Sequence, residues 1–524
     1  MSKKTIISIL SVLIFIIVTG CNEGSQDPTT EQNNTIQVAV TSDSGANKLD
    51  ATSYEGSMQL YTAVYDPLVK YGENGNIKPG LAESWEISKD GKEYVFHLRK
   101  DVKFSDGSDF NADALLFSIH RWKNKKEHAW LKTAEALKKV KKIDNYTVKM
   151  FFSEPNALIL NELTTARPFR IMSPNSVKPA GDPNGEFKEA IGTGPWRIVS
   201  YEKDNETVLT PNQYYWKGKL NDKKMVWKVI PNAQTRSLAL QEGSIQIAGG
   251  EMGKISYQDL KMFRNNDKYK VESERGTTSY FLAINNQKKS LQDVKVRQAL
   301  NYAINKENLA NQVLDDNGSP ATGLFAKTVP FVTKENSPGY AYNLNKAKKL
   351  LEEAGYGAKG KELKLNLVFQ TEEFPEWKEI SEIIQNNLHE VGIEVELNNM
   401  ESTSYYHSLW EKQDYDLLLY RTYADGLNPQ GFLNSLFAIN GDGKGIAYTD
   451  EHLSEYITTA GKAITNEERQ EAYDKIFSYM HNNAVTVPLF YPDNIFVHQS
   501  DVKGFTWGPI VDNPVIWNNL EKEE

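Results

Sequence analysis

The order of apolar and polar positions predicts strands and helices that follow one another along the chain. Residues 94–99 (YVFHLR) alternate between apolar and polar side chains, which is typical of a half-buried strand. Residues 364–370 (KLNLVFQ) and 393–397 (IEVEL) are also predicted as strands, and residues 376–390 between them as a helix. Two strands joined by a helix form a βαβ-like unit, and strand and helix signals are mixed along the chain, so the pattern predicts an α/β or α+β fold.

Asparagines mark two expected helix starts. Asn111 stands before an apolar stripe that includes Leu115 and Ile119, and its side-chain oxygen can accept hydrogen bonds from the first helical N–H groups. Asn343 stands in the same relation to residues 344–354, which Gly355 follows as a helix stop.

Composition limits the size and the class of the protein. The chain has 524 residues, of which 40% are hydrophobic, so more than one core is expected. The net charge of −9 argues against a nucleic-acid binder, which needs clustered Lys and Arg for phosphate contacts. The single cysteine excludes disulfide frameworks and cysteine zinc sites.

That cysteine follows an N-terminal export pattern. Two lysines within residues 1–4 precede an apolar run over 5–18, which suits a signal peptide and is too short to span a bilayer. The following Val-Thr-Gly-Cys21 resembles the lipobox of bacterial lipoproteins, in which the cysteine is lipidated and becomes the mature N-terminus. The alternative is a chance cysteine behind an uncleaved signal.

The export pattern divides the N-terminus into a signal peptide over 1–20 and a lipidated cysteine with a flexible tether over 21–34. The tether is polar, and its 13 residues after Cys21 reach roughly 20 Å as a flexible chain. We therefore expect a body held by lipid at the outer face of the cytoplasmic membrane.

Common catalytic patterns do not occur in the sequence. The chain contains no G-x-S-x-G, no H-E-x-x-H and no P-loop, which weakens hydrolase, zinc-protease and nucleotide-hydrolysing interpretations. The eight histidines show no pair at the short spacing of metal-binding helices, so no metal ligand is assigned from spacing. We expect neither catalysis nor a permanent cofactor.

Four motifs carry a family resemblance over some 400 residues. AVYDPLVKY (63–71), LAESWEISKDGKEYVFHLRKDVKFSDG (81–107), GTGPW (192–196) and VRQALNYAINKENL (296–309) resemble the solute-binding proteins of peptide and nickel ABC importers. The resemblance implies two α/β lobes that close on a small ligand, two hinge crossings, delivery to a membrane permease and no catalysis. It also implies a monomer that binds no nucleic acid.

The same resemblance implies the lobe boundaries. Residues 35–275 with 485–524 are expected to form lobe 1, and residues 276–484 lobe 2. The hinge crossings are expected close to Arg275 and Ala484.

Local motifs are most similar to the nickel-binding branch. They are His128-Ala-Trp130-Leu131, the R-P-F-R run of 167–170, Arg421-Thr-Tyr423 and Met58, which lies seven positions before Tyr65. The resemblance implies that five side chains bind the ligand: Arg167, Trp130, Tyr423, Met58 and Arg421.

Each assignment has a physical basis and an ordinary alternative. The planar guanidinium of Arg167 suits a carboxylate but repels a bare divalent cation, so it implies Ni(II) inside an anionic organic chelator; the alternative is a structural ion pair. Trp130 and Tyr423 can form flat walls or pack in a core. Met58 can place a soft thioether near the metal or fill space. Arg421 can also be a strand-end surface residue.

The sequence departs from the nickel branch at three places. Glu127 replaces an arginine, Leu427 replaces an aromatic residue, and residues 435–445 offer no histidine. These changes favour a metal whose coordination is already largely satisfied, for example by free histidine or a histidine-derived metallophore.

Two alternatives to the nickel-chelate receptor remain open. A short-peptide receptor of the same fold would hold the peptide N-terminus with an acidic residue, for which Asp425 is the nearest candidate. An enzyme or an adhesin at the cell surface is a competing class, against which the missing catalytic motifs and the single family-length body argue.

Overall fold

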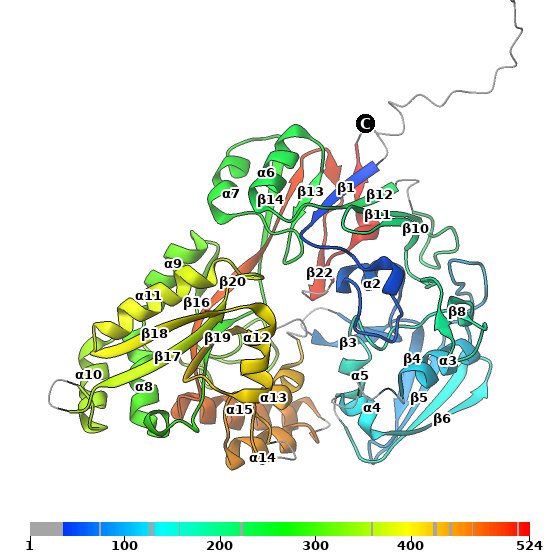
Figure 1. The fold of residues 1–524 in the computed structure, drawn as a ribbon. Helices are drawn as coiled ribbons and strands as arrows, with labels where there is room; N and C mark the ends of the chain where they lie inside the picture. Colours follow the sequence, from blue (N-terminus) through cyan, green and yellow to red (C-terminus); the bar gives the residue numbers. More distant parts are fainter. Residues whose placement is uncertain are drawn as a thin grey trace, which may run out of the picture.

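A computed structural model describes residues 35–72, 75–123, 125, 128, 131–156, 158–220, 224–357, 360–422, 427–439, 443–463, 465–510 and 513–523. Strands and helices alternate through most of this range, which confirms the predicted α/β fold (Figure 1). Among the described residues, no helix is both long and apolar enough to cross a bilayer.

The large sheet has twelve strands and is built from two groups that meet at the long strand β20 (Thr486–Gln499). The first group consists of β1 (Thr35–Val40), β10 (Trp196–Glu202), β11 (Glu206–Pro211), β12 (Lys224–Val229), β13 (Ile247–Gly249) and β14 (Tyr269–Arg275). The second group consists of β15 (Tyr280–Ile284), β16 (Gly318–Pro320), β17 (Leu363–Gln370), β18 (Ile393–Met400) and β19 (Leu417–Arg421).

The strand β20 connects the two groups because its two halves have different partners. Residues 486–492 pair with β15 and β16, whereas residues 493–499 pair with β13 and β14. The change of partner falls between Pro492 and Asp493, and the segment 276–279 between β14 and β15 forms the other connection. By this pairing, residues 486–492 go with the second group, and the expected lobe division at 484/485 stays a prediction.

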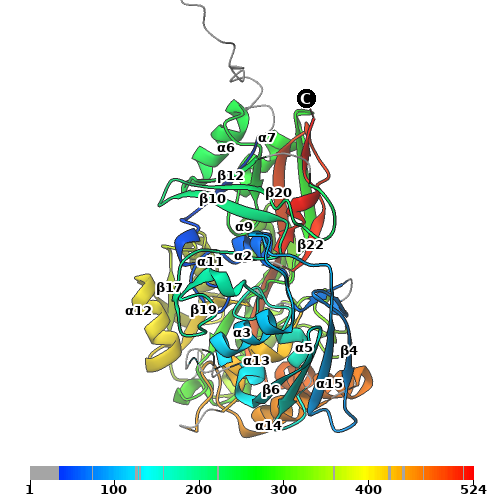
Figure 2. The ribbon, with the colours of Figure 1, turned by 90° about the vertical axis from the view of Figure 1, so that its right-hand side faces the viewer.

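A separate four-stranded sheet lies at the opposite end of the molecule from β10 and β12 (Figure 2). Its strands are β4 (Ala82–Ile87), β5 (Glu93–Leu98), β7 (Thr147–Phe152) and β6 (Leu137–Asp144), in that order. Two-stranded pairs form from β2 (Val69–Tyr71) with β3 (Ile77–Pro79), β8 (Val177–Lys178) with β9 (Glu186–Phe187), β21 (Val502–Lys503) with β24 (Glu521–Lys522), and β22 (Trp507–Ile510) with β23 (Asn513–Val515).

Helices cover both groups of strands. Those before β14 are α2 (Met58–Val64), α3 (Ala112–Lys123), α4 (Lys132–Ala136), α5 (Ile159–Glu162), α6 (Ala233–Glu242) and α7 (Tyr257–Arg264). Those after it are α8 (Val294–Ala303), α9 (Lys306–Leu314), α10 (Leu344–Glu353), α11 (Trp377–His389), α12 (Ser402–His407), α13 (Pro429–Phe437), α14 (Glu451–Ala460) and α15 (Asn466–Asn482). Short single turns of other helix types cover 46–48, 174–176, 289–291, 408–412 and 517–519.

The local predictions at the helix starts are confirmed. The Asn111 side chain accepts from the N–H groups of Asp113 and Ala114, and the Asn343 side chain accepts from Lys346 N at the start of α10. The βαβ-like unit is confirmed too, because β17 and β18 pair in parallel on either side of α11.

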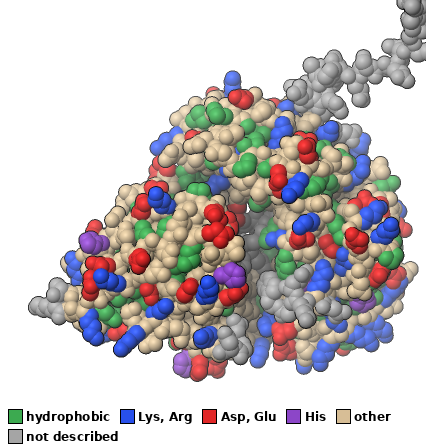
Figure 3. Space-filling model, in the orientation of Figure 1, with side chains coloured by type: hydrophobic (Ala, Val, Ile, Leu, Met, Phe, Trp, Pro, Cys, Tyr) green, Lys and Arg blue, Asp and Glu red, His purple; other side chains and the backbone are tan. Residues whose placement is uncertain are grey.

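The buried apolar residues separate into distinct cores. One large cluster takes all its members from residues 280–490, and the three next largest take theirs from residues 36–269 and 496–520. We call residues 280–490 the second lobe, and residues 35–275 with 493–523 the first lobe. The surface is hollowed between the two lobes in the lower half of the view in Figure 3.

Candidate ligand-binding site

Arg167 is held against the backbone segment that precedes α2. Its Nη1 donates to the carbonyl oxygens of Tyr54 and Gly56, the latter over 2.8 Å. Its guanidinium carbon lies 6.0 Å from the centroid of the Tyr54 ring, within the range of a cation–π contact. These contacts set the direction of a half-buried, permanently charged group.

Met58 is brought to the same segment. It is the first residue of α2, two positions after Gly56, and its half-buried side chain packs against an apolar cluster of the first lobe. The structure therefore brings the Arg167 side chain into contact with the stretch of backbone, 54–58, that contains Met58.

His128 lies beneath this stretch. Its side chain is fully buried, its Nε2 is 2.8 Å from Thr52 O, and its ring meets the Tyr54 ring edge-on at 5.0 Å. Because a carbonyl oxygen only accepts, Nε2 donates a proton here and is not a free metal ligand. The histidine of the HAWL motif thus supports the loop from below.

Tyr54 joins Arg167 to His128, and sequence reasoning missed it. Its ring contacts both side chains and packs against the apolar cluster behind the four-stranded sheet. No motif distinguishes Tyr54 from the other 25 tyrosines, so only the tertiary contacts reveal its position.

The observed contacts of Arg421 are with other residues, away from Arg167 and the 54–58 segment. At the end of β19, its Nη1 lies 2.9 Å from Glu251 Oε1 of the first lobe, and its guanidinium lies 4.9 Å from the Phe374 ring. Burial acts to lower the pKa of Arg421, but the Glu251 carboxylate and the surrounding tyrosines together raise it. Its role as a ligand contact stays a prediction, while the ion pair is a structural fact.

Leu427 is a second place where the lobes touch. It is 8% exposed and forms a small cluster with Tyr71 and Ile77 of the β2–β3 hairpin. At the hairpin tip, a Cβ added to Gly75 would lie 2.9 Å from Pro330 Cγ of the second lobe. The position that lacks the aromatic residue of the nickel branch therefore packs across the lobes.

The remaining predicted residues, Trp130, Tyr423 and Cys21, and also Glu127 and Asp425, lie outside the described residues. Their roles stay predictions. Within the part of the chain that the structure describes, no group of three or more His, Cys, Asp or Glu side chains is arranged to hold a metal.

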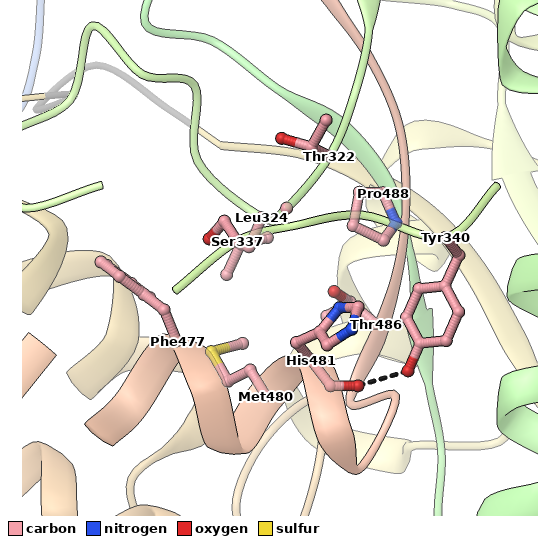
Figure 4. Close-up of a pocket in the computed structure, with 10 residues that line it drawn as sticks. Thr322, Leu324, Ser337, Tyr340, Phe477, Met480, His481, Thr486 and Pro488 are labelled. Atoms are coloured by element: carbon pink, nitrogen blue, oxygen red, sulfur yellow. Dashed lines mark hydrogen bonds between the residues drawn. The ribbon is translucent and has the colours of Figure 1, made fainter. Parts of the chain in front are cut away.

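A small cavity inside the second lobe is separate from the predicted residues. It measures about 20 Å³ and lies between α15 and the loops around Thr322 and Ser337. Figure 4 shows the His481 and Tyr340 rings side by side, with the Tyr340 hydroxyl donating to the His481 carbonyl. The buried Lys306 ammonium lies on the Tyr340 ring, 5.9 Å from its centroid.

Comparison with known proteins places the chain among exported binding proteins. The family model described as "Bacterial extracellular solute-binding proteins, family 5 Middle" matches residues 76–444. The nickel-binding periplasmic protein of Escherichia coli K12 is 31% identical over 470 residues, covering 86% of this chain and 88% of that protein.

Two further relatives differ in what their names say they bind. The dipeptide-binding protein of Escherichia coli K12 is 29% identical and covers 88% of this chain and 89% of that protein. The crystal structure of NikA from Brucella suis in complex with Fe(III)-EDTA superposes with a TM-score of 0.84 at 28% identity, covering 93% of this chain and all of that one.

Proposed function

Because this chain belongs to family 5 of the bacterial extracellular solute-binding proteins of ABC importers, we propose that it captures Ni(II) inside a small organic chelator. It delivers the chelate to a membrane permease without chemical change. Free histidine or a histidine-derived metallophore supplies most of the metal ligands.

The observation that carries this proposal is the setting of Arg167. Its guanidinium is fixed on the 54–58 segment beside Met58, within an R-P-F-R run that resembles the nickel branch. A fixed positive charge repels a bare divalent cation and attracts the carboxylates of a chelator. NikA of Brucella suis, a relative with a crystal structure in complex with Fe(III)-EDTA, holds a metal in this form.

The ligand lies between the lobes in this proposal. Trp130 and Tyr423 form its flat walls, and closure of the lobes around β20 and 276–279 removes water from it. The permease takes the closed form, so ligand binding acts by shifting the balance toward that form. A signal peptide over 1–20 and lipid on Cys21 keep the protein at the outer face of the membrane.

A short peptide is the second candidate ligand. The 29% identity to the dipeptide-binding protein over 88% of this chain supports it. In that case Asp425 holds the peptide N-terminus, and Arg167 contacts the backbone or the C-terminal carboxylate.

Calorimetry on metal-stripped protein tests the proposal. The titrants are nickel alone, nickel with excess L-histidine, and a mixture of dipeptides and tripeptides. Heat from the nickel–histidine mixture alone supports the chelate, and heat from the peptides alone overturns it. Arg167→Ala is expected to abolish the heat, whereas the control Arg99→Ala removes an arginine that also donates to a carbonyl, Gly80 O, but does not touch the 52–58 segment.

A further inference from the structure

A short loop of the first lobe carries charges toward the second lobe. Residues 250–256 connect β13 to α7, and the backbone anchors them: Thr41 N donates to Met252 O over 2.6 Å, and Gly250 N donates to Ile495 O over 2.8 Å. A Cβ on Gly249 would come within 2.4 Å of Ile495 O, so glycine at this position allows the close approach. The loop therefore moves as part of the first lobe.

Two ion pairs of opposite polarity connect this loop to the second lobe. Glu251 Oε1 lies 2.9 Å from Arg421 Nη1, and Lys254 Nζ lies 2.9 Å from Glu376 Oε1. The first lobe thus contributes a negative charge, Glu251, and a positive charge, Lys254. The second lobe contributes the opposite charge to each pair. Because a shifted docking would bring like charges together, the pattern favours one relative position of the lobes.

The receiving side chains are fixed to the second lobe. Arg421 lies over the Phe374 ring, which stacks on Trp377 at 4.5 Å, and Trp377 belongs to the core of that lobe. Glu376 precedes α11 and accepts from the Tyr280 hydroxyl at 3.4 Å. The charged side chains on both sides are therefore held by the rigid part of their own lobe, and they move only when the lobe moves.

The pair of Glu376 and Lys254 stays ionised over the physiological range. Burial acts to raise the pKa of Glu376, but the neighbouring Lys254 lowers it overall. For Lys254, burial acts to lower the pKa, and the nearby Tyr257 and Glu376 raise it overall.

We propose that Glu251 and Lys254 form an electrostatic latch with Arg421 and Glu376 that holds the lobes partly closed before any ligand arrives. The latch rests on the proposed function in one respect, namely that the lobes open and close to capture a ligand. Exposed fractions between 20% and 41% make all four side chains accessible to salt, so the latch weakens as ionic strength rises. Arg421 then acts on closure through Glu251, in place of a direct ligand contact.

Small-angle X-ray scattering on ligand-free mature protein tests the latch. The radius of gyration of the wild type is expected to rise between low and high NaCl, whereas the double variant Glu251→Gln/Lys254→Gln is expected to show the larger value at both. Lys295→Gln is the control, because it breaks a similarly exposed pair with Glu353, 3.0 Å long, inside the second lobe. It is expected to behave as the wild type.

A charge swap gives a second, independent readout. Glu251→Arg with Arg421→Glu restores one attraction and is expected to recover the compact form, which either substitution alone loses. Affinity for nickel–histidine is expected to fall roughly threefold in the double Gln variant. Equal radii for wild type and double Gln variant at every salt concentration would overturn the latch. If the radius of gyration changes with salt as expected but the protein binds no nickel chelate, the latch is supported and the proposed ligand is wrong.

Discussion

The Nη1 of Arg167 donates to the carbonyl oxygen of Gly56 over 2.8 Å. This bond joins the guanidinium of Arg167, which belongs to the R-P-F-R motif, to the backbone segment just before α2, which begins at Met58. In the proposed function Arg167 has two roles: it orders the 54–58 segment, and its positive charge attracts the carboxylates of the chelator. The account of the site depends on separating these roles by experiment.

Replacement of Arg167 by lysine separates them. Lysine keeps the positive charge but loses the planar fork, so one carboxylate hydrogen bond worth about 1.5–3 kcal/mol is removed. We expect binding of nickel–histidine to weaken by roughly ten- to a hundredfold in calorimetry. Thermal unfolding of the same variant is the control: a fall in affinity without a fall in melting temperature assigns the loss to the ligand.

Gly75 tests whether the β2–β3 hairpin must meet the second lobe. Gly75→Ala places a Cβ 2.9 Å from Pro330 Cγ, so we expect the ligand-free protein to open and the affinity for its ligand to fall several-fold. Gly181→Ala is a matched control, because Gly181 has a similar φ of +80° against +75° but no atom within 4 Å of the added Cβ. If both variants lose affinity equally, backbone strain explains the effect and the hairpin contact does not.

Lys306 predicts how stability changes with pH. Burial lowers the pKa of this lysine from 10.5 to about 8 in the folded protein. Between these values the unfolded chain binds more protons, so the contribution of Lys306 to the free energy of unfolding rises with pH. Below about pH 8 the ammonium is charged in both states and its burial destabilises the fold by a constant amount.

Lys306→Met is therefore expected to stabilise the protein at pH 7, by at most about 3 kcal/mol, and to lose this advantage toward pH 10.5. Urea unfolding at several pH values measures it. Lys348→Met, at an exposed position on α10, is the matched control and is expected to change little. A variant that is less stable than wild type at pH 7 would contradict the assigned burial cost.

Cys21 tests the membrane anchor. Cys21→Ser removes the thiol that the lipobox resemblance assigns to lipidation, so we expect the protein to move from the membrane fraction to the medium or soluble fraction. Fractionation of cells that express each form measures this. Equal membrane association of both forms would show that an uncleaved signal or another contact holds the protein.

Local sequence patterns were sufficient to predict those elements that neighbouring residues determine. The cap at Asn343 and the βαβ unit of β17, α11 and β18 depend on neighbouring residues and on a repeating apolar pattern, and both were predicted. The family resemblance supplied the larger fold, which no periodicity of the chain reveals. It also directed attention to Arg167 and Met58, and the structure shows the Arg167 side chain bound to the segment that contains Met58.

The contacts between lobes could not be predicted in the same way. Glu251 and Arg421 are 170 positions apart, and neither has a neighbour in sequence that signals the other. Tyr54 and His128 meet only because the segment before α2 folds over the end of α3. The partner change within β20 likewise depends on which strands lie beside it. The Pro-Asp-Asn of 492–494 interrupts the apolar run at this point, but it does not reveal which strands pair on either side.

Native mass spectrometry tests the central claim, capture of a nickel chelate, most directly. Metal-stripped mature protein is mixed with nickel, L-histidine and a set of dipeptides and tripeptides together, so that the candidate ligands compete. The account predicts a single bound mass equal to one nickel with histidine, absent from Arg167→Ala. A bound mass equal to a peptide, or nickel bound without histidine, would contradict it.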